Sequence, residues 1–180
     1  ALLPHIWLSD EEIRQGQRLL EQLPDKAGTP PIALHPYATH PDKAWKEAYW
    51  RQLMELFESR GIPWIVIGRG NGMEGIPASR NFTNRTSLRE TCALLKSSSL
   101  LITGDSGPMH LAGAVGTPVL ALFGPTTEEW GFFPAGPKDR VLESQLDCRP
   151  CTLHGKKHCD RNHACMQSIT PEQVMRALDE

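Results

Sequence analysis

The chain has 180 residues, of which 39% are hydrophobic and 22% charged, and its formal net charge is −2. This length and composition fit one soluble globular domain with its own core, and the near-neutral charge argues against nucleic acid as the main partner. No apolar run approaches the roughly 18 residues of a membrane-spanning helix, and the N-terminus lacks the features of a signal peptide, so we expect a cytoplasmic protein.

Helices are predicted at intervals along the chain, and local signals mark where several of them begin or end. Ser9 with Glu12, and Ser87 with Glu90, have the spacing of capping boxes, which open helices. Gly61 follows an amphipathic segment in the manner of a C-cap residue. In chain order, the predicted helices cover 9–23, 45–60, a segment opened at Ser87, 107–115 and 171–179.

Short apolar runs alternate with these helices and are predicted to be strands. They cover 32–35, 62–68, 99–104 and 118–124. Buried strands that alternate with helices indicate a parallel sheet with helices on both faces. The sequence therefore predicts an α/β domain of the Rossmann-like kind.

Each predicted strand ends in a polar or glycine-rich loop. The four loops read HPYATHPDK, GRGNG, GDSG and GPTTEE. Ligands of open α/β sheets bind outside the carboxyl ends of the strands, so we expect these loops to gather around a binding site.

The loop GDSGPMH (104–110) leads from a strand directly into a helix N-terminus. The first N–H groups of a helix have no partners within the helix and carry partial positive charge, so such an end binds anions such as phosphate. Ser106 can cap the helix or donate to a phosphate oxygen, and His110 can reach the same anion. The alternative is an ordinary strand-to-helix turn that Asp105 or Ser106 caps.

The loop after the first strand supplies the candidate cation for that anion. Lys43 brings the charge, and Thr39 and His40 are polar residues that can face a ligand. The alternative for Lys43 is a solvated surface lysine.

A second glycine pattern, GNGMEG (70–75), fits the dinucleotide fingerprint G-x-G-x-x-G. That fingerprint requires a strand before the glycines and a helix directly after them. Because Pro77 stands where the helix would run, we interpret this stretch as a flexible loop over the site.

Four of the five cysteines lie close together in the sequence, with the spacing C-x2-C-x7-C-x5-C. Cys148, Cys151, Cys159 and Cys165 could bind a structural zinc ion, with nearby histidines as substitute ligands. Disulfides, which a reducing cytosol disfavours, and free thiols are the alternatives. In each case we expect the cysteines to hold together segment 148–165, which lacks an apolar core of its own.

The segment DSGPMHLAGAVGTPVLALFGPT (105–126) resembles the signature of glycosyltransferase family 9, the ADP-heptose:lipopolysaccharide heptosyltransferases. IALHPYATHPDKAW (32–45) is similar to the family's first strand and its K-x-W element, formed here by Lys43 and Trp45. Two further stretches, 86–107 and 148–174, resemble the segment before the signature and the C-terminal ending.

The resemblance implies a GT-B fold, in which two Rossmann-like domains face each other across a cleft. This chain would be the C-terminal half, with 1–31 as connector and first helix and 32–180 as the nucleotide-sugar-binding domain. Two residues depart from the family's usual pattern: Tyr37 stands in place of a glycine, and Lys46 in place of a proline.

The resemblance also implies a role for particular residues. It implies that the sugar-nucleotide donor is bound by Thr39, Lys43, Thr86, Asp105, Ser106, Gly107 and His110. The implied reaction is an inverting transfer from ADP-heptose in lipopolysaccharide core biosynthesis, with no divalent metal required. The base and the acceptor site would belong to the missing N-terminal domain, so we expect the isolated chain to bind donor weakly or not at all and to be inactive.

By the same resemblance, the full enzyme would act in the cytoplasm at the inner face of the inner membrane and would attach to it peripherally. Two alternatives belong to other classes of protein. One is a non-catalytic nucleotide-binding module. The other is a metal-stabilised interaction domain built around the cysteines.

Overall fold

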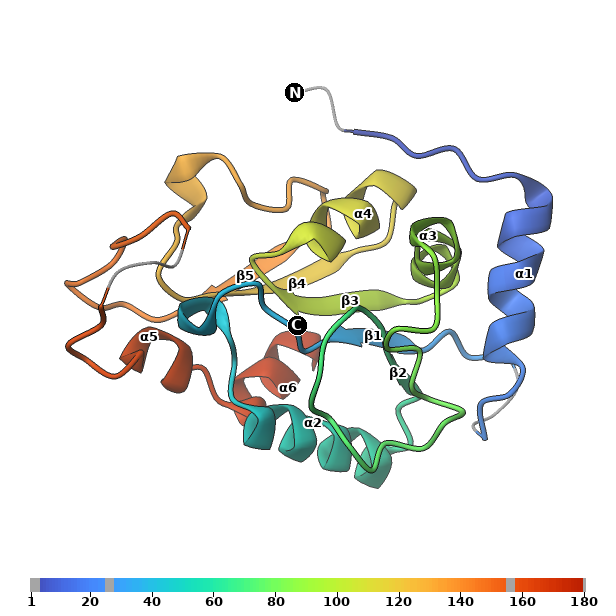
Figure 1. Ribbon diagram of the computed structural model, residues 1–180, viewed down its shortest axis with the longest axis horizontal. Coiled ribbons are helices and arrows are strands. Elements are labelled where there is room, and N and C mark those ends of the chain that lie inside the picture. Colours follow the sequence, from blue (N-terminus) through green and yellow to red (C-terminus); the bar gives the residue numbers. More distant parts are fainter. Residues whose placement is uncertain (1–3, 25–27, 155–157, 180) are drawn as a thin grey trace.

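A computed structural model of the chain describes residues 4–24, 28–154 and 158–179. Its centre is a sheet of five parallel strands in the order β2-β1-β3-β4-β5 (Figure 1). The strands are β1 (Ile32–His35), β2 (Trp64–Val66), β3 (Leu100–Gly104), β4 (Val119–Phe123) and β5 (Arg140–Glu143).

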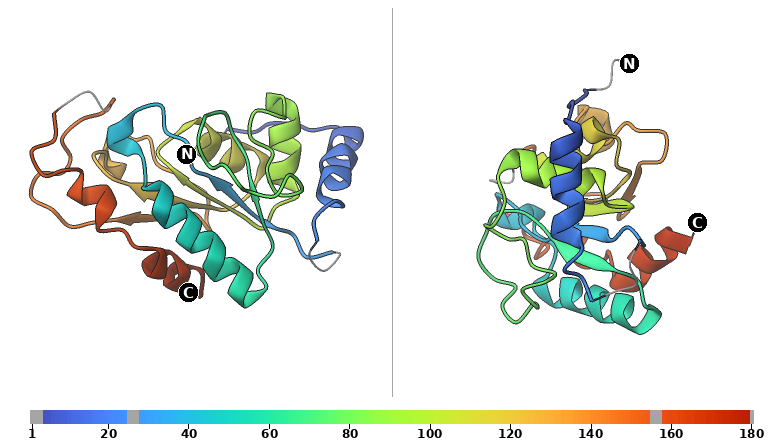
Figure 2. Two further views of the ribbon diagram at one scale, coloured as in Figure 1. Left: turned by 60° about the horizontal axis from the view of Figure 1, so that its bottom comes forward. Right: turned by 90° about the vertical axis from the view of Figure 1, so that its right-hand side faces the viewer.

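Helices cover both faces of this sheet, as the two rotated views in Figure 2 show. The α-helices are α1 (Asp10–Leu20), α2 (Glu47–Arg60), α3 (Leu88–Lys96), α4 (Gly107–Val115), α5 (Ala164–Gln167) and α6 (Pro171–Asp179). Two short 3-10 helices are η1 (Pro41–Lys43) and η2 (Glu128–Trp130). None of the helices in the described part of the chain is both long and apolar enough to cross a membrane.

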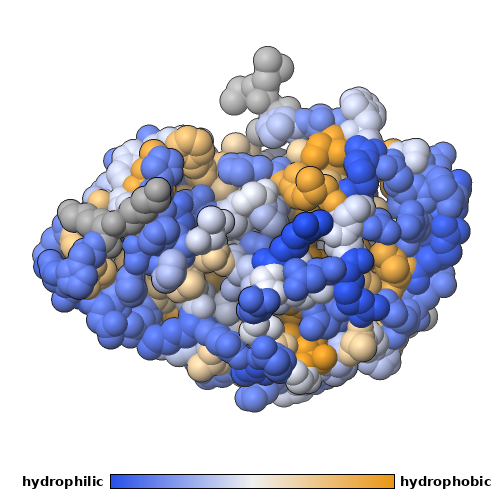
Figure 3. Space-filling model, viewed as in Figure 1, coloured by the Kyte–Doolittle hydropathy of each residue, from blue (hydrophilic) through white to orange (hydrophobic). Residues whose placement is uncertain are grey.

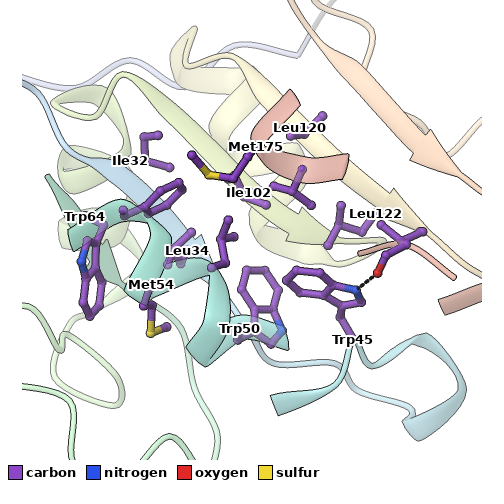
Figure 4. Close-up of a cluster of buried hydrophobic side chains, with 14 of the residues drawn as sticks. Ile32, Leu34, Trp45, Trp50, Met54, Trp64, Ile102, Leu120, Leu122 and Met175 are labelled. Atoms are coloured by element: carbon purple, nitrogen blue, oxygen red, sulfur yellow. Dashed lines mark hydrogen bonds between the residues drawn. The ribbon is translucent and has the colours of Figure 1, made fainter. Parts of the chain in front are cut away.

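The alternation of side chains along β1 separates two hydrophobic cores. Ile32 and Leu34 face the layer formed by α2 and α6, whereas Ala33 belongs to the core under α3 and α4. The first core holds a cluster of tryptophans, in which the indole N–H of Trp45 donates to the carbonyl oxygen of Ile169 at 2.8 Å (Figure 4). This bond anchors the chain two residues after Lys43.

The Rossmann-like α/β fold predicted from the sequence is confirmed. Both capping boxes form as expected, and Gly61 ends α2 with a φ of +63°, in the left-handed region that glycine adopts without strain. The prediction of four strands was incomplete, because β5 also pairs with the sheet. Only Val141 and Leu142 are apolar in this half-buried edge strand, so it lacks the continuous apolar run of the others.

The connections create a topological switch point. From β1 the chain passes through α2 to β2 on one side, and then through α3 to β3 on the other side of β1. The loops that follow β1 and β3 therefore leave the sheet in different directions. In open α/β sheets the crevice between such loops is where ligands bind.

Candidate functional site

A cavity of about 440 Å³ lies at this switch point. Residues after β1, after β2 and at the start of α4 line it, so three of the four loops expected around a site come together here. The fourth loop, after β4, does not contribute to the described lining. Four of the residues predicted from the sequence line the cavity: Thr39, Thr86, Ser106 and Gly107.

The N-terminus of α4 is open to this cavity. No acidic residue occupies the first turn of α4, whereas α1 and α3 each carry acidic residues there. Gly107 is exposed, and a Cβ atom built on it would meet nothing within 4 Å, so a ligand can approach its backbone closely. The partial positive charge of this helix end is therefore accessible to an anion.

Ser106 occupies the N-cap position of α4, but its side chain makes no capping hydrogen bond. The capping alternative is therefore wrong for Ser106. Its hydroxyl lies 2.9 Å from Thr103 Oγ1 and 3.3 Å from His35 Nδ1 instead. Asp105 does not cap either: its Oδ2 accepts a hydrogen bond from Lys43 Nζ at 2.7 Å.

This Lys43–Asp105 ion pair lies between the loop after β1 and the loop before α4, and both side chains are largely buried. The ammonium group is thereby held near the start of α4 and does not extend into solvent. The alternative of a solvated surface lysine is wrong. His110 is exposed on the first turn of α4. Like Lys43 and Asp105, it is not among the described residues that line the cavity.

The charges around the cavity favour an anionic ligand. Of the described residues that line it, none carries a carboxylate, while Arg69 contributes a guanidinium group. Tyr37 forms part of the wall, and its hydroxyl lies 2.7 Å from Thr83 Oγ1. Burial raises the pKa of Tyr37, so it stays neutral.

The loop 70–75 is not followed directly by a helix, so the dinucleotide interpretation finds no support. Within this loop, Met73 is buried in the core beside α2, and Gly70 packs so closely on Tyr37 that a Cβ atom there would lie 2.3 Å from its ring. The loop is therefore packed against the wall of the cavity.

The cysteine-rich segment packs beside the same edge of the sheet. Arg149, between two of the cysteines, is almost completely buried, and its guanidinium donates to the carbonyl oxygens of Gly124, Thr126 and Ser144. These bonds connect the segment to the loop after β4. At a second point, His163 Nε2 lies 2.7 Å from Asp42 Oδ1, directly before Lys43.

The four clustered cysteines line a common cavity of about 240 Å³. Within the described ranges, no three His, Cys, Asp or Glu side chains are arranged to hold a metal ion. The zinc prediction for Cys148, Cys151, Cys159 and Cys165 therefore stays a prediction. Burial raises the pKa of Cys165, which keeps this thiol protonated.

Sequence reasoning did not find several residues of this region, among them His35, Arg69 and Arg149. His35 ends an apolar strand, and nothing in its immediate sequence distinguishes it from a core histidine. Arg69 directly follows a predicted strand, and this position at the carboxyl edge was the one signal available for it.

Figure 3 shows the face of the molecule in the view of Figure 1 as largely hydrophilic, with small, separate hydrophobic patches.

A parallel sheet with an open helix N-terminus at its switch point is the arrangement of a Rossmann-like nucleotide-binding domain. The profile of glycosyltransferase family 9 (heptosyltransferase) matches residues 8–160. The chain belongs to this family.

Two curated relatives illustrate the similarity. Lipopolysaccharide heptosyltransferase 1 of Pseudomonas aeruginosa is 35% identical over 153 residues, which cover 77% of this chain and 40% of that protein. Lipooligosaccharide heptosyltransferase 2 of Campylobacter jejuni is 33% identical over 150 residues, which cover 74% of this chain and 44% of that protein. The chain thus spans less than half the length of these two relatives.

Solved structures share the fold. ADP-heptose lps heptosyltransferase II of Escherichia coli superimposes with a TM-score of 0.76 at 23% identity, covering 99% of this chain and 53% of that one. A family 9 glycosyltransferase of Veillonella parvula gives a TM-score of 0.74 at 23% identity, covering 97% and 52%. The chain thus spans about half the length of each of these two structures.

Proposed function

We propose that this chain is the donor-binding domain of an inverting glycosyltransferase and that it binds the diphosphate of a nucleotide sugar, with ADP-heptose as the donor. The observation that carries the proposal is that the start of α4 and the loop that carries Lys43 meet at one cavity, where none of the described lining residues has a carboxylate. Family membership supports the choice of donor. The solved relative TibC of enterotoxigenic E. coli is described in complex with ADP-D-beta-D-heptose.

In this proposal the diphosphate lies at the start of α4. The backbone N–H groups of Ser106 and Gly107 and the Ser106 hydroxyl donate to phosphate oxygens, and Lys43 adds a positive charge from the neighbouring loop. Thr39 lies on the same side of the cavity. His110, which is exposed on the first turn of α4, is a further proposed contact of the phosphate.

The residues around the cavity also suggest where the nucleoside and the sugar of the donor bind. Thr86 and the exposed Leu88 lie at the mouth of the cavity, where an apolar side chain and a hydroxyl suit the nucleoside. A carboxylate repels a diphosphate, so we assign to Asp105 two other contacts. It holds Lys43 in place and accepts a hydrogen bond from a hydroxyl of the sugar.

The reaction proposed for the full-length enzyme is a displacement at the anomeric carbon. A carboxylate base takes the proton of the acceptor hydroxyl, the oxygen attacks the anomeric carbon, and the bond to the diphosphate breaks. The helix end and Lys43 stabilise the charge that develops on the leaving ADP, so this step needs no divalent metal ion.

The base and the acceptor site belong, in this proposal, to the second domain of the full-length protein. The acceptor is of the lipopolysaccharide type, and the enzyme works at the cytoplasmic face of the membrane. The isolated chain then binds ADP weakly, with a dissociation constant on the order of millimolar, and transfers no heptose.

The test is an NMR titration of the 15N-labelled chain with ADP, because this method detects weak binding. Saturable shifts at the amides of Thr39, Thr86, Ser106 and Gly107 support the proposal. Adenosine, which lacks the diphosphate, is the matched ligand and should bind at least about tenfold more weakly. Equal affinity for both ligands, or no saturable shift with ADP, contradicts the diphosphate site. Heptose transfer by the isolated chain contradicts the proposal that the base and the acceptor site belong to the second domain.

Metal analysis tests the zinc prediction for the four clustered cysteines. TibC is described as iron-containing, which makes this measurement worthwhile here. One zinc ion per purified chain supports a structural metal site. Metal-free protein with four titratable thiols in the cluster contradicts that site and the metal-stabilised interaction domain with it.

A further inference from the structure

His35, the last residue of β1, is a buried histidine at the base of the cavity. Its side chain lines the cavity although the residue is only 6% exposed. Nδ1 of its ring lies 3.1 Å from Thr103 Oγ1 and 3.3 Å from Ser106 Oγ, and the two hydroxyl oxygens are 2.9 Å apart. The three polar groups thus form a closed triangle directly beneath the start of α4.

Neighbouring strands hold the ring of His35 in this position. The register of the sheet pairs His35 with Thr103 on β3. On the other side the ring contacts Gly68, where a Cβ atom would lie 2.5 Å from Cδ2 of the imidazole. Tyr37 packs edge-on against the ring, with centroids 5.8 Å apart. The imidazole therefore has little freedom to turn away from the hydroxyl groups.

The hydrogen bonds of the triangle define which proton is available to a ligand. The Thr103 hydroxyl is within reach of the carbonyl oxygen of Gly104, at 3.1 Å, and donates to it. The oxygen of Thr103 can then accept from the other two members. Ionised phosphate oxygens only accept, so Ser106 must direct its own proton to a phosphate ligand. This requires that another group donate to Thr103 and Ser106, and His35 Nδ1–H is the donor in reach.

We propose that His35 is a positioning residue of this site: its neutral ring, protonated at Nδ1, donates to Thr103 and Ser106 and so leaves the Ser106 proton free for a phosphate of the bound nucleotide. The inference rests on the nucleotide-diphosphate site proposed above. It adds a residue that does not touch the reacting atoms but sets the direction of a hydroxyl that does contact the ligand.

The electrostatic surroundings of His35 agree with a neutral ring. Burial lowers the pKa of His35 to about 4, so the imidazole is uncharged near neutral pH. The titratable or charged groups around the ring are the phenol of Tyr37, the Lys43–Asp105 ion pair and the guanidinium of Arg69. The carboxylates of Glu47 and Glu74 act electrostatically on Tyr37, and Glu47 is paired with Arg51. A bound diphosphate would add negative charge beside the ring and would raise the pKa of His35.

The first measurement needs no mutation. In wild-type protein at pH 7, 15N chemical shifts of the imidazole distinguish the two neutral tautomers. We expect His35 to carry its proton on Nδ1, and its pKa to rise when ADP is added to saturation. A ring protonated on Nε2, or the same pKa with and without ADP, overturns the proposal.

The second measurement uses variants of the full chain. His35→Asn keeps a short N–H donor, whereas His35→Leu removes it while filling much of the space. We expect ADP to bind about tenfold more weakly to His35→Leu and within about threefold of wild type to His35→Asn. The exposed His5 serves as control, and His5→Asn and His5→Leu should both bind like wild type. Dispersed amide spectra verify that each variant is folded.

The outcomes separate the two proposals. Binding of ADP by wild type with equal affinity in His35→Leu overturns the role of His35 alone, and so does a His35→Asn variant as weak as His35→Leu. Absence of ADP binding in wild type overturns the nucleotide site and this inference with it.

Discussion

The Nζ atom of Lys43 lies 2.7 Å from Oδ2 of Asp105, and the two side chains are 16% and 12% exposed. The pair joins residues 62 positions apart, one after β1 and one before α4. Asp105 therefore has two opposite effects on an anion at the start of α4. It holds the lysine in place, and it also compensates the lysine's charge.

These two effects lead to a prediction for substitutions in the pair. Lys43→Met should weaken the binding of ADP about tenfold, because a charge-assisted contact to phosphate is lost. Asp105→Asn should bind ADP as tightly as wild type or a few times more tightly, because the uncompensated lysine then faces the diphosphate. NMR titration of each variant gives the dissociation constants.

Lys46→Met is the matched control for this prediction. Lys46 is exposed three residues after Lys43 and lies over the ring of Tyr49, 5.2 Å from its centroid, so its removal should leave ADP binding unchanged. Equal weakening by Lys43→Met and Lys46→Met would show that only the overall charge matters. In that event the site would not depend on the ion pair.

A second contact connects the cysteine-rich segment to the same loop. His163 Nε2 lies 2.7 Å from Asp42 Oδ1, and Asp42 is largely buried. His163→Gln should lower the free energy of unfolding by about 1–2 kcal/mol, because a hydrogen bond to a buried carboxylate is weakened. It should also weaken ADP binding, since η1 carries both Asp42 and Lys43. Urea denaturation and NMR titration measure the two effects.

The same segment offers an exposed histidine–aspartate pair as control. His158 and Asp160 lie 3.3 Å apart and are 90% and 89% exposed. His158→Gln should change the free energy of unfolding by less than about 0.5 kcal/mol. If both histidine variants lose the same stability, the contact with Asp42 has no special role in holding the loop.

The elements that the sequence predicted correctly are those with local signals. Ser9 with Glu12 and Ser87 with Glu90 satisfy each other within one helical turn, so their geometry follows from spacing alone. The same holds for Gly61, whose left-handed backbone ends α2. The buried strands could be predicted because each is a short continuous run of apolar residues.

The parts of the site that escaped prediction depend on contacts between distant strands. Whether Ser106 caps its helix or turns toward His35 is decided by the register that pairs His35 with Thr103. That register cannot be predicted from the sequence of the loop 104–110. Likewise, Lys43 finds Asp105 only because β1 and β3 are neighbours, and the strand order is not encoded in either loop.

Burial of His35 predicts a particular dependence of stability on pH. Its pKa is about 4 in the folded chain and about 6.5 in the unfolded one, so the unfolded state binds the proton more readily. The contribution of His35 to the free energy of unfolding is therefore complete above its pKa in the unfolded chain, and it decreases as the pH falls from about 6.5 to about 4. The total loss from this one group is roughly 3 kcal/mol.

Urea denaturation of wild type and His35→Asn between pH 4 and 7.5 isolates this contribution. The variant lacks the imidazole, so it should lose less unfolding free energy than wild type as the pH falls. His5→Asn, at an exposed position, should follow the wild-type curve. Parallel curves for wild type and His35→Asn would contradict the burial of a neutral ring.

Arg149 gives a test of how the cysteine-rich segment is anchored. Its guanidinium donates to several carbonyl oxygens and to Glu143, and its side chain is 7% exposed. Lysine is a point charge and cannot serve these acceptors together, so Arg149→Lys should cost about 2–4 kcal/mol. Arg176→Lys on the exposed face of α6 should cost less than about 0.5 kcal/mol. Equal unfolding curves for both variants would contradict the anchoring role.

A pair of glycines provides the last test. Gly68 has a φ of +120°, and a Cβ atom there would lie 2.5 Å from the ring of His35, so Gly68→Ala adds backbone strain and displaces the imidazole. We expect a loss of at least about 2 kcal/mol in unfolding free energy together with weaker ADP binding.

Gly113, within α4, is exposed, and a Cβ atom there would meet nothing within 4 Å. Gly113→Ala should therefore stabilise the chain by about 0.5–1 kcal/mol, because alanine loses less backbone entropy in a helix, and should leave ADP binding unchanged. The two variants make the same chemical change and differ only in surroundings, so opposite signs of the stability change are the expected result. If Gly68→Ala is as stable as Gly113→Ala and binds ADP normally, the wall formed by Gly68 does not hold His35 in the position on which the triangle depends.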